Sequence, residues 1–146
     1  MLKLIDTHSH INFNAFKDDA DEVIKRAFDE GVFMLAVGSQ ISTSERAVEY
    51  AKKYEKGIWA VVGLHPIHLE EIDIDEHEVK FKSRKEEFDY ERYKKLAEDP
   101  KVVGIGECGL DYYRIDDIPA DNDFLKAQQI RVFKDQMRLA LDANWR

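Results

Sequence analysis

The sequence predicts an α/β fold in which a parallel β-sheet is covered by helices. Short apolar runs and helical segments with one apolar face alternate four times along the 146 residues. Parallel neighbours need crossover connections, and in such an alternation the helices supply them. No Pro/Gly-rich linker interrupts the series, so one ordinary domain is expected. The residues with ligand-binding side chains follow the strands, and sites in parallel α/β proteins form at the carboxyl ends of strands.

The first unit combines a strand at residues 2–6 with a helix at residues 18–30, which Gly31 is placed to end. His8 and His10 follow the strand two positions apart, so in extended backbone their imidazoles point the same way. Two converging imidazoles present a pair of nitrogen ligands to one metal ion. The alternative is two polar residues in a loop.

The second and third units follow the same order. The continuous apolar run at residues 32–37 is typical of a strand buried on both faces. Ser42-Thr-Ser-Glu45 has the spacing of a capping box and predicts the start of the next helix. A third strand at residues 58–62 leads to His65, which either caps a loop or contributes to a site.

A charged connection at residues 70–87 precedes the third helix, expected at residues 88–98. The connection is acidic first and then basic, and such a run is usually a solvated surface. If it lies over a site, its basic end could contact an anionic substrate. The basic residues are Lys80, Lys82, Arg84 and Lys85, and the inward side of the helix is expected to contain Tyr90, Tyr93, Leu96 and Ala97.

The fourth unit has a strand, residues 102–107, that ends on a carboxylate. Alternation places Val103, Ile105 and Glu107 on one face, and the two glycines between them on the other. Such a strand holds a carboxylate at the rim of a buried sheet, whereas the alternative is an ordinary strand with a solvated end. A loop at residues 111–122 and a helix at residues 123–142 follow. The apolar stripe of this helix is expected to comprise Ile130, Phe133, Met137, Ala140 and Leu141.

The composition narrows the class of protein. The N-terminus lacks the pattern of a signal peptide, and no stretch approaches the ~18 apolar residues that span a bilayer, so no membrane contact is expected. The single cysteine, Cys108, excludes an internal disulfide, fits the cytoplasm and is expected to be a packed thiol. The net charge of −8 argues against simple electrostatic binding of nucleic acid. It leaves room for a nucleic-acid enzyme whose metal ions supply the positive charge.

The residues at the ends of the first and fourth strands are expected to converge. His8, His10 and Glu107 form a set of two imidazoles and one carboxylate, which suits zinc or another divalent transition metal. The sequence contains no phosphate-binding Gly loop, nucleophile elbow or Cys–His pair. The pattern therefore favours a metal site.

Three motifs in this order resemble the TatD family of metal-dependent deoxyribonucleases. They are Asp6-Thr-His-Ser-His10, Val62-Gly-Leu-His-Pro66 and Gly104-Ile-Gly-Glu-Cys-Gly-Leu-Asp-Tyr-Tyr113. The spacing of five further residues is similar to the helix that follows in that family: Gln129, Phe133, Gln136, Leu139 and Ala140. The His-x-His pair alone fits any amidohydrolase-like barrel, whereas the third motif is more specific.

The resemblance implies a (β/α)8 TIM barrel, of which residues 1–146 hold the first four βα units, as the N-terminal half of one metal-dependent hydrolase domain without a second domain. It implies one or two divalent metal ions (Mg, Mn or Zn) and DNA as the substrate, with phosphodiester bonds cleaved by metal-activated water. By the same resemblance His8 and His10 are metal ligands, and Glu107 is the catalytic carboxylate that binds or bridges the metals. His65 resembles a residue near the substrate phosphate. Asp111 lies in the third motif without an assigned role beyond shaping the site.

The sequence departs from the family in one large respect. A (β/α)8 barrel takes ~250 residues, and the family's later His ligands and final Asp have no positions here. The chain alone is therefore expected to be incomplete or inactive as a nuclease. The alternatives are another amidohydrolase-type metal hydrolase, and a catalytically incompetent half-barrel that acts as an assembly or binding module.

Four strands taken from a barrel leave the first and the fourth with open edges. Unpaired edges pair with other chains. The face that carries Leu4, Val61, Val103 and Ile105 is expected to be exposed, and large exposed apolar patches mark interfaces. We therefore expect self-association or pairing with a missing C-terminal half, and a chain that is dimeric or poorly soluble.

Overall fold

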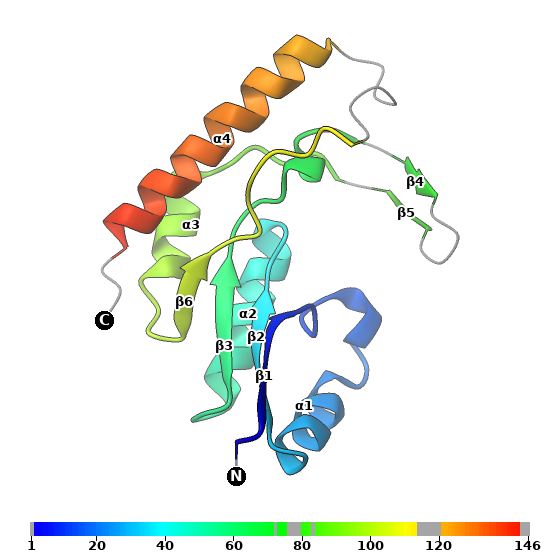
Figure 1. Cartoon of the computed structure of the whole chain (residues 1–146), viewed down its shortest axis with the longest axis vertical. Coiled ribbons are helices and arrows are strands. Elements are labelled where there is room, and N and C mark those ends of the chain that lie inside the picture. Colours follow the sequence, from blue (N-terminus) through cyan, green and yellow to red (C-terminus); the bar gives the residue numbers. More distant parts are fainter. Residues whose placement is uncertain (1, 72, 76–79, 83, 114–120, 144–146) are drawn as a thin grey trace.

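The computed structural model describes residues 2–71, 73–75, 80–82, 84–113 and 121–143 (Figure 1). One four-stranded sheet has the order β1-β2-β3-β6, and each neighbouring pair is parallel. The predicted α/β fold with a parallel sheet is confirmed. The strands are β1 (Leu4–Ser9), β2 (Val32–Val37), β3 (Ile58–Val62) and β6 (Val102–Ile105).

Helices connect the strands, and α2 and α3 lie behind the sheet in the view of Figure 1. They are α1 (Ala20–Asp29), α2 (Ile41–Lys53), α3 (Tyr90–Ala97) and α4 (Asn122–Asp142), with short 3-10 turns at η1 (Asn14–Phe16) and η2 (Pro66–Leu69). Gly31 has a φ of 77° just after α1, so the predicted glycine stop is confirmed. No helix in the described part of the chain is long and apolar enough to cross a membrane.

The connection at residues 70–87 holds structure that the charge pattern does not predict. A second, antiparallel sheet pairs β4 (Asp73–Asp75) with β5 (Lys80–Lys82). The side chains of Lys80 and Lys82 lie outside the described residues, as do residues 114–120 of the loop predicted at 111–122. Further along the connection, both oxygens of the Glu86 carboxylate lie 3.1 Å from the backbone nitrogen of Ile41 and accept its hydrogen. The connection is thus fixed to the start of α2.

The start of α2 differs from the prediction, because the capping box is not at Ser42. The helix begins at Ile41, and Thr43 Oγ1 accepts hydrogen bonds from the backbone nitrogens of Ser39 and Gln40, each at 2.9 Å. Glu45, predicted to close the box, instead forms an ion pair with Arg92 of α3 at 2.6 Å. The capping box therefore joins Gln40 and Thr43, two residues earlier than the predicted pair Ser42 and Glu45.

The hydrophobic core lies between the sheet and the helices. The residues that share this face in register include Met34 with Ile58, Ala36 with Ala60, and Val62 with Ile105. Ile24 of α1 and Tyr93 of α3 are fully buried against them. At about 1.5–3 kcal/mol for each large apolar side chain, this one-sided core is the main stabilising contribution to the sheet.

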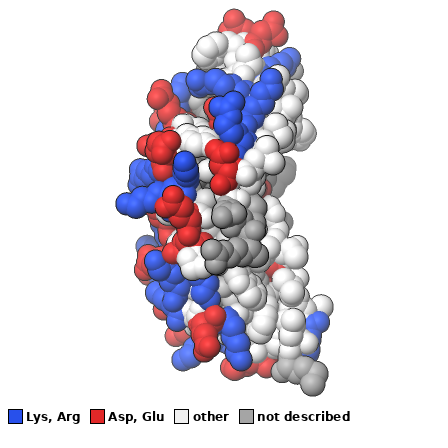
Figure 2. Space-filling model, turned by 90° about the vertical axis from the view of Figure 1, so that its left-hand side faces the viewer, with Lys and Arg blue, Asp and Glu red and all other residues white. Residues whose placement is uncertain are grey.

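The opposite face of the sheet is only partly covered. Leu35 and Trp59, neighbours in register, are half-buried, so the prediction that β2 is buried on both faces is wrong. Leu4 and Val103 are exposed, as expected. Figure 2 shows Lys, Arg, Asp and Glu of both signs crowded on one side of the view, whereas the side that faces the viewer in Figure 1 is largely uncharged. The open face therefore carries few charges in this view, and Leu4 and Val103 are exposed apolar side chains on it.

Two predicted faces are wrong. In β6, Gly104 is in register with Val61 and Ile105 with the buried Val62, because a register shift follows Ala60. Ile105 consequently packs against the core and does not share the open face. In α4 the buried residues are Leu125, Gln129, Val132, Gln136 and Leu139, whereas the predicted Ile130, Met137 and Leu141 are exposed. The most apolar stripe of α4 is thus not its buried face.

Candidate metal centre

Three side chains from opposite edges of the sheet meet at its carboxyl end. His8 Nε2 lies 3.4 Å from Glu107 Oε1, and His10 Nε2 lies 3.9 Å from Glu107 Oε2. One nitrogen or oxygen from each of the three residues lies within 4.8 Å of the others. The convergence that strand-end geometry predicts is confirmed, and metal binding by these residues stays a prediction.

This convergence depends on the path of the chain after β6. The histidines belong to or follow β1, and Glu107 follows β6, so two strands separate them in the sheet order. In a flat sheet such strands lie about 14 Å apart, because neighbouring strands are 4.7–4.9 Å apart. The distance is bridged because the chain after β6 crosses the end of β3, so that Glu107 lies beside the end of β2, the neighbour of β1.

Hydrogen bonds orient the histidines. His10 Nδ1 lies 3.1 Å from the carbonyl oxygen of Val37, and a hydrogen donated there leaves the Nε2 lone pair free toward Glu107. Phe13 packs on the other side of this ring, with ring centroids 4.2 Å apart. The backbone nitrogen of His8 donates to Asp6 Oδ1 at 3.0 Å, which bends the end of β1 where its register with β2 shifts.

Backbone contacts hold Glu107 above the middle of the sheet. Its nitrogen donates to the carbonyl oxygen of Gly38, and the nitrogen of Gly106 donates to Val62, both at 2.9 Å. The loops after β3 and β6 come into close contact at Gly63 and Gly106. A Cβ on Gly63 would lie only 2.5 Å from the carbonyl carbon of Gly106. No side chain fits at this contact.

The donor set suits a divalent metal ion. Donor atoms around a tetrahedral zinc ion lie about 3.4 Å apart, given ligand distances of 2.0–2.2 Å. The separation between His8 and Glu107 matches this value, and that between His10 and Glu107 is slightly larger. Two imidazoles and one carboxylate leave coordination positions open, which is typical of catalytic and not structural sites.

The sequence model of the family described as "TatD related DNase" matches residues 5–145 of the chain. The chain belongs to the TatD family. A "3'-5' ssDNA/RNA exonuclease TatD" from Cronobacter turicensis is 34% identical over 130 residues, which cover 88% of this chain and 44% of that protein. The "uncharacterized metal-dependent hydrolase YabD" from Bacillus subtilis is 36% identical over 142 residues, or 97% of this chain and 48% of YabD.

A solved structure shows the same family and fold. The crystal structure of YjjV, a TatD homologue from Escherichia coli K12, matches with a TM-score of 0.71 and 25% identity. The match covers 97% of this chain and 48% of YjjV. The chain therefore spans about half the length of the TatD relatives that it matches.

Two further residues of the TatD-like motifs, His65 and Asp111, are not part of this three-residue cluster. His65 precedes η2, where its Nδ1 accepts a hydrogen bond from the nitrogen of Ile67 at 3.1 Å. It lines one cavity of about 610 Å³ together with Glu107. Asp111 Oδ1 accepts from the nitrogen of Tyr113, so in the described residues it shapes a turn. Cys108 is exposed, and its prediction as a packed thiol is wrong because the chain at this point is already beyond the sheet.

Two buried glutamines position the loops of the site, and the apolar pattern of α4 does not reveal them. Gln136 Oε1 accepts from the nitrogen of Leu64 and Gln136 Nε2 donates to the oxygen of the same residue, both at 2.9 Å. Gln129 makes the same pair of contacts with Asp111, at 2.8 and 2.9 Å. Each glutamine thus pairs with the backbone nitrogen and oxygen of one residue in a loop that follows a strand. The sequence gives one signal for these two residues, namely that both stand in the pattern that resembles the TatD helix.

His68 is a further buried residue next to His65. It is 8% exposed, and the two ring centroids lie 6.5 Å apart. Burial, assisted by the charge of His65, lowers the pKa of His68 to about 4. The imidazole of His68 is therefore neutral at pH 7.

Proposed function

We propose that this chain contributes the first part of the active site of a metal-dependent nuclease that hydrolyses phosphodiester bonds in nucleic acid. The observation that carries the proposal is the convergence of His8, His10 and Glu107 from the two outer strands. Family membership supports it, and the Cronobacter relative is named as an exonuclease of single-stranded DNA and RNA.

In this proposal His8, His10 and Glu107 bind one or two divalent ions, with Mg, Mn and Zn as the candidates. When bound, such an ion stabilises the negative charge that develops on a phosphodiester and activates water. Glu107 is the catalytic carboxylate, because it is the charged group at the centre of the cluster. His65 binds substrate, since it lines the cavity that begins at Glu107 and a phosphate there would lie between the two.

We further propose that residues 1–146 correspond to the first four units of a (β/α)8 barrel, as the N-terminal half of one hydrolase domain. The sheet order supports this, because β1, β2, β3 and β6 pair in parallel and in chain order, with helices in the connections. The kind of partner that we propose follows from the two open edges of the sheet, at β1 and β6. They would be covered by further βα units, either from a second copy of the chain or from a C-terminal half.

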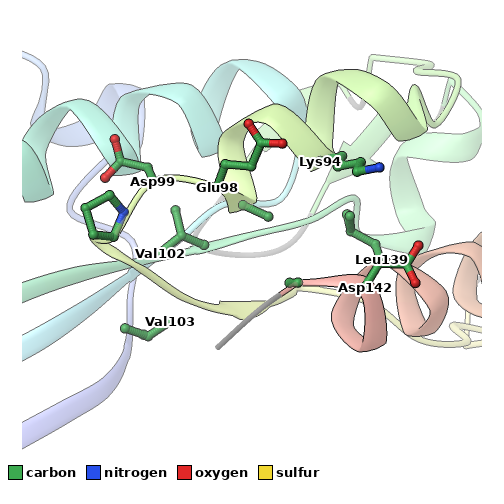
Figure 3. A pocket seen from close by; sticks show the side chains of 10 residues that line it. Lys94, Glu98, Asp99, Val102, Val103, Leu139 and Asp142 are labelled. Atoms are coloured by element: carbon green, nitrogen blue, oxygen red, sulfur yellow. The ribbon is translucent and has the colours of Figure 1, made fainter. Parts of the chain in front are cut away.

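The β6 edge has the shape that such a neighbour needs. A hollow of about 600 Å³ lies between β6, the end of α3 and the end of α4 (Figure 3). Val103 is exposed in this hollow, Val102 and Leu139 line it from buried positions, and Lys94, Glu98 and Asp142 add charged groups to its lining. An exposed apolar side chain and charged neighbours beside an unpaired strand edge suit an interface. This observation favours the alternative role of the half-barrel as an assembly module.

A nuclease assay tests the main proposal. The purified chain would be incubated with end-labelled single-stranded DNA in Mg²⁺, Mn²⁺ or Zn²⁺. We expect little or no cleavage by the chain alone, as the sequence analysis predicts, and we expect both EDTA and His8→Ala to abolish any cleavage that occurs. Rapid cleavage that His8→Ala leaves unchanged would contradict the site. Weak or absent metal binding, together with no cleavage, would favour the assembly module.

A further inference from the structure

The cavity that His65 and Glu107 line extends away from the metal centre toward the start of α2. It has a volume of about 610 Å³ and contains residues from four parts of the chain: Phe13 beside β1, Arg46 on α2, His68 on η2, and Arg84 on the connection before α3. Two arginines face one carboxylate here, in a chain whose net charge is −8. This local excess of positive charge favours an anionic ligand.

Arg46 is the central cation of the cavity. It is half-buried, and its Nη1 donates to the carbonyl oxygen of Asn12 at 3.0 Å and to Asn14 Oδ1 at 2.8 Å. Both acceptors are neutral, and within the described part of the chain no carboxylate forms an ion pair with Arg46. Arg92 offers a contrast on the same side of the molecule, because Glu45 neutralises it at 2.6 Å. Arg46 is therefore held in place by neutral groups with its charge uncompensated.

The wall next to the metal centre is aromatic. Phe13 is half-buried, stacks on His10 with ring planes 31° apart, and lines the cavity. Nucleobases stack on such side chains without strong sequence preference. On the other side, His68 is more than nine-tenths buried, and its Nδ1 has no hydrogen-bond partner among the described residues. The cavity thus combines a cationic wall, an aromatic wall and a buried polar group.

We propose that this cavity is the subsite for one nucleotide of the bound strand, with its phosphate on Arg46 and Arg84 and its base against Phe13. The inference rests on the proposed function, and it deepens it by naming the residues that position the strand beside the metal centre. Arg46 is the main anchor, because its guanidinium is already fixed by Asn12 and Asn14 and loses little conformational freedom on binding. Arg84 adds a second positive charge from an exposed position.

Equilibrium binding in EDTA tests this subsite without metal. Fluorescence anisotropy would follow a labelled oligothymidylate bound to the full chain, in competition with thymidine 5'-monophosphate, thymidine or inorganic phosphate. We expect Arg46→Gln to weaken binding about tenfold, as loss of a charge-assisted hydrogen bond to phosphate does. Arg92→Gln, the matched control, should bind as the wild type does. Arg46→Lys keeps the charge and should lose less than Arg46→Gln.

Phe13→Leu tests the contact with the base separately from the contact with the phosphate. It should weaken the binding of thymidine 5'-monophosphate at least about fivefold, which is the effect of losing one base stack. Competition by inorganic phosphate should be unchanged. Equal binding by the Arg46→Gln and Arg92→Gln variants, with circular dichroism showing both folded, would overturn the proposal. Competition by inorganic phosphate as strong as that by the nucleotide would also overturn it. Arg46-dependent binding in a chain that takes up no metal would instead leave this subsite standing and refute the proposed nuclease site.

Discussion

The two faces of α4 differ, and each departs from the pattern of a simple amphipathic helix. The buried face carries Gln129 and Gln136 among its apolar residues, and the exposed face carries Phe124, Met137 and Leu141. The glutamines are buried because they complete the hydrogen bonds of Leu64 and Asp111, the residues that follow β3 and β6 in the loops of the site. The inner face of α4 therefore positions loops of the site as well as filling the core, whereas the outer face leaves large apolar side chains exposed.

The largest expected effect is on the inner face. Gln136→Leu would leave both the nitrogen and the oxygen of Leu64 without partners in a buried position. We expect a loss of about 4 kcal/mol in the free energy of unfolding, because each unsatisfied buried group costs about 1–3 kcal/mol. Urea titration measures it. Met137→Gln, one residue further on the exposed face, is the control and should change stability by less than about 0.5 kcal/mol. Equal stability of the two variants would remove the distinction between the faces.

A somewhat smaller effect is expected from pH, through His68 in the η2 turn that α4 contacts. Burial lowers the pKa of His68 from 6.5 to about 4 in the folded chain. As the pH falls below 6.5, the unfolded chain takes up the proton first, so stability decreases between about pH 6.5 and pH 4. The loss has an upper limit of about 3 kcal/mol, at 1.36 kcal/mol for each pKa unit. The free energy of unfolding, plotted against pH over this range, should have a much smaller slope in His68→Phe than in the wild type. An unchanged slope would show that other groups cause the pH dependence.

The smallest effect on stability, and the clearest on association, is expected from the exposed face. Met137→Lys combined with Leu141→Lys places charge on surface that is open in the chain alone. We expect the dissociation constant of a dimer to rise at least about tenfold, or about 1.4 kcal/mol, with little change in unfolding. Sedimentation at several concentrations measures it. A wild-type chain that remains monomeric at high concentration would show that this face and the sheet edges need no partner.

Much of the fold could be predicted from the sequence, because the local signals and the tertiary structure agree there. The strands at residues 32–37 and 58–62 have the predicted bounds, and Gly31 ends α1 as expected. These features depend on apolar runs and on backbone conformations that few residues adopt. The convergence of His8, His10 and Glu107 was predictable for a related reason, since parallel strands direct their carboxyl ends to one edge of the sheet.

The missed features depend on contacts between distant parts of the chain. Hydrophobicity ranks Met137 above Gln136, and only the unpaired backbone groups of Leu64 reverse that order. The face of Ile105 depends on a register shift relative to β3, which alternation within one strand cannot reveal. The sequence alone likewise does not indicate the proposed role of Arg46. That role depends on hydrogen-bond acceptors of Asn12 and Asn14, more than thirty residues away.

Metal titration tests the central claim most directly, namely that the ends of β1 and β6 form one metal centre. Zinc or cobalt binding would be measured in competition with a chromophoric chelator for the wild type and for His8→Ala, Glu107→Gln and His65→Ala. We predict that the wild type binds at least one equivalent. His8→Ala and Glu107→Gln should each bind at least about tenfold more weakly, as expected for the loss of one ligand, while His65→Ala keeps the wild-type affinity. Equal affinity in the wild type and His8→Ala, or an equal loss in His65→Ala, would contradict the assignment of the centre.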